Sequence, residues 1–102
     1  MPFKTYRDRS PQYWAWREAV LQRCNYECDI TGAAQLFHRL EAHHLNSWYY
    51  FPAERYDPDN GIALTVREHI IFHEWLGTLV ATRKLYEIYR PQRIRELLVY
   101  NR

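Results

Sequence analysis

The stretch NGIALTVREHIIFHEWLG, residues 60–77, contains the pattern that most strongly predicts the fold of this chain. It opens with Asn60-Gly61, a pair typical of turns, and continues with a short apolar run that fits a β-strand. From about Arg67 the apolar residues recur at helical spacing, and Gly77 is a natural C-terminal cap. We therefore expect a turn, a strand and a helix in direct succession.

A partner strand is expected upstream, over residues 37–45, and it ends in the pentapeptide EAHHL. The segment that joins the two strands, residues 46–59, contains five aromatic residues and two prolines. Such a composition predicts an ordered loop that is packed by its own rings.

Helices are expected on both sides of this core. Ser10 and Pro11 offer a capping side chain and a proline at the first helical position, which predicts a helix that runs to about Arg23. Residues 24–34 have the character of a turn or knuckle. Towards the C-terminus, the apolar spacing predicts two further helices that are broken at Pro91.

The expected fold class is therefore α+β, a ββα core with an N-terminal helix and C-terminal helices. The 102 residues suffice for a single domain, with its core over residues 24–77 and flanks at 1–23 and 78–102. No run of about 18 apolar residues and no secretory signal is visible, so we expect neither a membrane partner nor export. Cys24 and Cys28 are too few for a disulfide framework and indicate a reduced, cytoplasmic protein.

The formal net charge of +2 is unevenly distributed along the chain. Residues 1–23 carry five basic and two acidic side chains, residues 24–82 carry three basic and eight acidic ones, and residues 83–102 carry six basic and two acidic ones. Basic ends around an acidic, histidine-rich middle suit a cation-binding centre with two phosphate-binding flanks. Solvated helix faces would give the same pattern, and charge alone favours that second interpretation.

Four of the five histidines lie in two pairs. His69 and His73 are four residues apart on the expected helix, so both rings leave one face and can bind one metal ion. The metalloprotease motif with this spacing needs Glu where the chain has Ile70, so a protease is disfavoured. His43 and His44 are strand neighbours that point to opposite faces, which suits two tasks. One would complete a three-histidine metal site and the other would take a proton from water, whereas exposed strand-end histidines are the alternative.

Three elements, EAHHL at residues 41–45, NGIAL at 60–64 and HIIFH at 69–73, resemble the HNH (ββα-metal) nuclease family. They occur in the family's order with family-like separations, in a pattern that spans about residues 24–77. The chain is similar to members with three histidine ligands, such as the nuclease domains of DNase colicins, and to small phage-type HNH proteins. The resemblance implies a metal-dependent endonuclease that hydrolyses DNA phosphodiester bonds.

The resemblance also implies a role for each residue of the motif. His43, His69 and His73 would be ligands of one divalent ion. His44 would be the general base, and Asn60 would bridge the hairpin and hold the loop of the base through hydrogen bonds. Many relatives have Asp where His43 stands and use magnesium or manganese, whereas histidine there favours zinc, nickel or another borderline metal.

One departure from the family concerns a second, structural zinc, which many HNH proteins hold with two Cys-x-x-Cys knuckles. The first knuckle is reduced here to Cys28 in the segment CDIT, and the second would fall at residues 65–68, which contain no cysteine. One thiolate cannot hold a structural zinc, so we expect the catalytic ion to be the only metal.

DNA is the expected partner, bound through its phosphate backbone. Arg55 either binds a phosphate or pairs with Asp57 or Asp59. The other candidates for backbone contacts are Arg7, Arg9, Arg83, Lys84, Arg93 and Arg95. No separate sequence-reading domain is evident, so specificity would come from the basic ends, a homodimer or a partner protein.

Two other functional classes are compatible with parts of this pattern. A catalytically inactive nucleic-acid-binding HNH-like module would keep the fold, but the intact His44 and Asn60 argue against it. A metal-stabilised interaction module would need a closed site with four protein ligands. The only further ligands of the usual zinc type are Cys24, Cys28 and His38.

Overall fold

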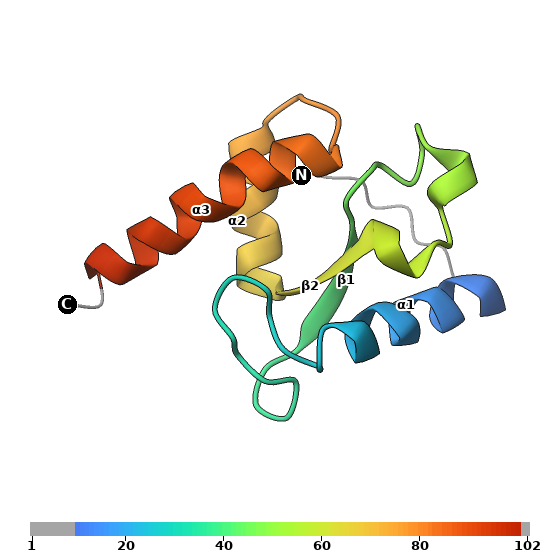
Figure 1. Cartoon of the computed structure of the whole chain (residues 1–102), viewed down its shortest axis with the longest axis horizontal. Coiled ribbons are helices and arrows are strands. Elements are labelled where there is room, and N and C mark those ends of the chain that lie inside the picture. The colour runs from blue at the N-terminus through green and yellow to red at the C-terminus, as the bar shows by residue number, and fades with distance from the viewer. Residues whose placement is uncertain (1–9, 101–102) are drawn as a thin grey trace.

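The computed structural model describes residues 10–100, which form three α-helices and a two-stranded antiparallel sheet (Figure 1). The elements occur in the order α1 (Pro11–Arg23), β1 (Leu40–His44), β2 (Gly61–Thr65), α2 (Val66–Leu76) and α3 (Arg83–Tyr100). Two short 3₁₀ helices, Pro52–Glu54 and Pro58–Asn60, lie between the strands. The hairpin lies between α1 and α2, both of which contact β1 and β2. The predicted α+β class is confirmed.

Helix α1 begins and ends where the sequence predicts. The Ser10 hydroxyl accepts a hydrogen bond from the backbone N–H of Tyr13 at 3.1 Å, and a proline occupies the first turn. The helix buries Trp16, Val20 and Leu21. These apolar side chains explain why α1 packs on the hairpin instead of standing apart in solvent.

The two strands pair in a register that places His44 opposite Gly61 and His43 opposite Ile62. Strand β1 is shorter than the predicted 37–45. The backbone N–H groups of Phe37 and His38 instead donate to the carbonyl of Ala34, which places these residues in a turn. Strand β2 agrees with the prediction to within one residue. The register places His43 and His44 at the end of the hairpin where the long loop connects the two strands.

Helix α2 follows β2 without an intervening loop. The Thr65 hydroxyl accepts a hydrogen bond from the N–H of Glu68 at 3.2 Å, and Gly77 ends the helix with a φ of +61°. A positive φ in this range has a low conformational free energy for glycine and a higher one for other residues. The predicted strand followed directly by a helix is confirmed, and the predicted turn is replaced by a short 3₁₀ helix that ends at Asn60, with Gly61 already extended in β2.

The C-terminal segment is one helix, so the predicted break at Pro91 is wrong. An internal proline removes one backbone hydrogen bond, but contacts on both sides of it stabilise the helix. Before the proline, the ring of Tyr89 packs on Phe72 of α2 with centroids 4.8 Å apart. After it, the buried guanidinium of Arg93 forms a two-pronged ion pair with buried Glu68, at 2.8 and 3.0 Å.

The hydrophobic core lies where the hairpin, α2 and α3 meet and where the end of α1 joins them. Its fully buried members include Leu21, Leu40, Leu64 and Phe72. Cys28 is also buried there, as expected for a small apolar residue. Within residues 10–100, no helix is long and apolar enough to cross a membrane.

Candidate metal centre and catalytic site

Strand β1 and helix α2 bring three imidazoles together, from His43, His69 and His73. The Nε2 atom of His69 lies 3.1 Å from Nδ1 of His43 and 3.1 Å from Nε2 of His73. One ligand nitrogen from each ring lies within 4.8 Å of the other two. Nitrogens that each bind one ion at about 2.0–2.1 Å have such separations. This three-histidine cluster is therefore able to hold a divalent metal ion, as the sequence predicts.

The carboxylate of Glu41 orients one ring of the three-histidine cluster. Nδ1–H of His69 donates to Oε1 of Glu41 at 2.8 Å, so the lone pair of His69 is on Nε2, the atom that faces the other rings. Metal-bound histidines commonly donate their second N–H to a carboxylate in this way. Glu41 is not among the residues predicted from the sequence, although its position two residues before His43 places both on one face of the strand.

Burial keeps two of these rings in the form that binds metal. His43 is 4% exposed, and its desolvation, reinforced by the neighbouring histidines, lowers its pKa well below 6.5. Desolvation and His69 lower the pKa of His73 to about 4, although the Glu41 carboxylate opposes this shift. Nε2 of His43 is buried without a hydrogen-bond partner among the described residues. The nitrogen of His43 that faces His69 is the other one, Nδ1, and a neutral ring can bind a metal ion through that atom.

Metal-free protein is expected to lose stability as the pH falls from about 6.5 towards 4. The unfolded chain protonates these histidines near pH 6.5, whereas the folded chain does so only at lower pH, so protons favour unfolding. Urea unfolding after EDTA treatment, at pH 7 and pH 5, measures the change. His73→Gln should weaken the pH dependence and His38→Gln, on the exposed turn, should not; equal stability at both pH values would contradict this account.

Replacement of Glu41 by glutamine is expected to weaken metal binding by about 10- to 100-fold, because the outer-shell carboxylate makes a ligating histidine more basic. Titration with zinc or nickel against a chromophoric chelator measures this affinity. Glu74→Gln is the matched control, because it removes an exposed carboxylate next to His73 on α2. Equal affinities for the two variants would show that the Glu41 contact does not orient a ligand.

His44 lies on the other face of β1 and takes no part in the three-histidine cluster. Its Nε2–H donates to the backbone carbonyl of Arg55 at 2.8 Å, so Nδ1 carries the lone pair of the neutral ring. Its ring stacks on Trp16 of α1, with centroids 3.8 Å apart and planes within 8° of parallel. The side chains of His43 and His44 therefore point to opposite faces of β1, as the alternation of side chains along a strand predicts.

Asn60 joins the end of β1 to the loop between the strands. Its side chain is 1% exposed, and its Oδ1 accepts from the N–H of Asn46 at 2.8 Å. Its Nδ2 donates to the carbonyls of Asn46 at 3.0 Å and Glu54 at 3.2 Å. The Glu54 carbonyl belongs to the residue before Arg55, whose own carbonyl binds His44. Asn60 therefore holds the backbone on which the His44 ring depends.

Arg55 is tied to the aromatic part of the loop. Its Nε–H donates to the carbonyl of Trp48 at 2.9 Å, and its guanidinium lies 3.7 Å from the centroid of the Trp48 ring. The described ion pairs do not join Arg55 to Asp57 or Asp59, which disfavours that alternative. Within this loop the rings of Tyr49 and Tyr50 contact each other but are exposed, and the Trp48 ring packs on Arg55, so the expected packing of the loop by its own rings is present only in part.

The remaining basic candidates fall into three groups. Arg83, Lys84 and Arg95 are exposed along α3. Arg93 is buried in its ion pair with Glu68 and also binds Glu96 at 3.0 Å, so we assign it a structural role instead of a phosphate contact. Arg7 and Arg9 lie outside the described residues.

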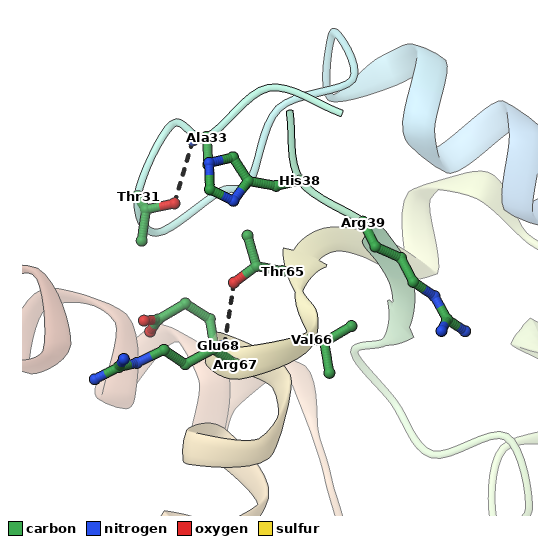
Figure 2. A pocket seen from close by; sticks show the side chains of 8 residues that line it. All are labelled: Thr31, Ala33, His38, Arg39, Thr65, Val66, Arg67 and Glu68. Carbon is green, nitrogen blue, oxygen red and sulfur yellow. Dashed lines mark hydrogen bonds between the residues drawn. The ribbon is translucent and has the colours of Figure 1, made fainter. Parts of the chain in front are cut away.

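A separate hollow lies at the start of α2 (Figure 2). Its lining includes Thr65, Arg67 and Glu68 but none of the three-histidine cluster. Figure 2 shows the side chains of Arg39 and Arg67 pointing away from each other. Because these charges do not converge, the hollow is not built around one anion.

No known family, curated protein or solved structure matched this chain when it was compared with all three.

Proposed function

We propose that this protein is a metal-dependent endonuclease of the HNH type that hydrolyses phosphodiester bonds of DNA. The observation that supports the proposal best is the separation of the two adjacent histidines. His43 faces two imidazoles of α2, whereas His44 is held on the opposite face by the Arg55 carbonyl and Trp16. A purely structural metal site needs the first arrangement and has no use for the second.

His44 is the general base of the proposed reaction. Its Nδ1 takes a proton from a water molecule, whose oxygen attacks phosphorus as the bond to the leaving 3′ oxygen breaks. A divalent ion held by His43, His69 and His73 would supply positive charge to the phosphate and the leaving oxygen. Asn60 and the Arg55 carbonyl keep the His44 ring in place, so that Nδ1 presents its lone pair in a fixed direction.

Phosphate contacts along the DNA backbone are assigned to arginine and lysine side chains. Arg55, whose own backbone carbonyl accepts from His44, is one of them, and its guanidinium is ordered by Trp48. The other members of this set are Arg83, Lys84 and Arg95 on α3, with Arg7 and Arg9 at the N-terminal end. Such contacts give affinity that depends on salt and not on base sequence.

Conversion of supercoiled plasmid to nicked or linear DNA tests the proposal. The protein is stripped with EDTA and supplied in turn with magnesium, manganese, nickel and zinc, beside His69→Ala, which lacks one ligand of the three-histidine cluster. We expect conversion with at least one metal, and none with EDTA or with His69→Ala. Binding of DNA without conversion under any metal would favour the catalytically inactive HNH-like module instead. If the protein neither binds nor cleaves DNA, the result would favour the metal-stabilised interaction module.

A further inference from the structure

The face of the His44 ring is covered by a side chain that comes from another part of the chain. Trp16, on α1, lies 28 residues upstream, and the two rings are stacked almost in parallel at 3.8 Å between centroids. Trp16 is 2% exposed and is among the largest fully buried side chains described. The contact therefore joins the N-terminal helix directly to the proposed general base.

Trp16 is itself fixed in position by two features. Its Nε1–H donates to the backbone carbonyl of Asp57 at 2.8 Å. A Cβ atom at Gly61, the strand partner of His44, would lie 2.8 Å from Cζ2 of Trp16 and 2.3 Å from Cγ2 of Val20. Glycine at this position therefore lets α1 approach closely enough for the indole to cover the imidazole.

The same short segment of backbone holds both rings. The Arg55 carbonyl accepts from Nε2–H of His44, and the Asp57 carbonyl accepts from Nε1–H of Trp16. The hydrogen bond at Nε2 does not by itself fix Nδ1, because Nε2 lies nearer to the Cβ–Cγ axis, about which the ring turns. A flat indole against the ring face opposes that turn, since rotation would break the stacked contact.

We propose that Trp16 is the positioning residue that fixes the direction in which His44 presents Nδ1. This inference rests on the proposed function, in which Nδ1 removes a proton from water. Trp16 does not touch the reacting atoms and acts only through the orientation of His44. A misplacement of about 1 Å in a reacting group costs about 100-fold in rate, so loss of the stacked face should lower kcat by a similar factor.

Three variants separate positioning from general stability. Trp16→Met fills much of the buried volume but has no flat face, and Trp16→Phe keeps an aromatic face without the hydrogen bond to Asp57. Leu21→Ala removes fully buried packing from the same helix, in the core cluster that includes Leu40. We expect kcat to fall about 100-fold in Trp16→Met, to be largely retained in Trp16→Phe, and to be unchanged in Leu21→Ala below its melting temperature. KM for DNA and the affinity for metal should change in none of them.

A readout that is independent of cleavage is the ¹⁵N spectrum of the His44 imidazole in metal-free protein. We expect the single Nε2–H tautomer, with slow exchange of that proton, in the wild type, Trp16→Phe and Leu21→Ala, and a mixture of tautomers with fast exchange in Trp16→Met. If Trp16→Met does not fold, Trp16→Leu, which also lacks a flat face, replaces it, with the same expected fall in kcat and the same mixture of tautomers against Leu21→Ala. Wild-type kcat with one tautomer in Trp16→Met, or equal losses in Trp16→Met and Leu21→Ala, would overturn the inference. If the wild type cleaves no DNA, the proposed function fails, and the spectra alone decide whether Trp16 orients His44.

Discussion

Substitution of His44 by alanine is expected to lower the cleavage rate by about 10²- to 10⁴-fold, the usual contribution of a positioned acid or base. Metal affinity should be unchanged, because the three-histidine cluster lies on the opposite face of β1. In the proposed reaction an alanine side chain cannot accept the proton of the attacking water, whereas His43, His69 and His73 are intact. The variant should therefore bind metal and DNA and leave the bond uncut.

Single-turnover cleavage of a labelled duplex measures the rate, and calorimetric titration measures metal affinity on the same preparation. His38→Ala is the matched control, since it removes an imidazole from an exposed turn. His69→Ala should give the opposite pattern, with weak metal binding and with cleavage lost for that reason. Cleavage by His44→Ala at the wild-type rate, with metal still bound, would remove His44 from the role of general base.

Much of the candidate ligand set could be predicted because it depends on local periodicity, whereas the choice of His43 over His44 as the third ligand came from the resemblance to HNH proteins. Four-residue spacing on a helix places His69 and His73 on one face, and strand alternation separates His43 from His44. The structure places all four as these periods require. The start of α1 at Ser10 and the end of α2 at Gly77 were predictable for the same reason, because a helix cap depends on the few residues next to it.

Other features depend on contacts between distant segments, which no local period records. Nothing near Trp16 indicates that its ring would stack on His44, and the fit depends on the missing side chain at Gly61. The continuation of α3 through Pro91 depends on the burial of Arg93 against Glu68, where tertiary packing outweighs a lost backbone hydrogen bond. The sequence does not distinguish Arg93 from the surface arginines, because its sequence neighbourhood does not reveal a buried partner.

Replacement of Asn60 by alanine is expected to cost about 3 kcal/mol of folding free energy, since each buried polar group left unpaired costs about 1–3 kcal/mol. The lost side chain accepts from Asn46 N–H and donates to two carbonyls, at Asn46 and Glu54. Thermal or urea unfolding measures the loss. Asp59→Ala, on the exposed neighbour, is the matched control and should stay close to the wild type.

Asn60→Ala should also lower the cleavage rate at temperatures where it is fully folded. Glu54 and Arg55 are consecutive, so release of the Glu54 carbonyl loosens the backbone that carries the acceptor of His44. Metal affinity should change little, because the ligands come from β1 and α2 and not from this loop. Asn60→Asp keeps the acceptor for Asn46 N–H but cannot donate, and it buries a charge, so it should be no better than alanine. If folded Asn60→Ala cleaved at the wild-type rate, Asn60 would contribute to stability alone, and the link from Glu54 to His44 would have no part in orienting the base.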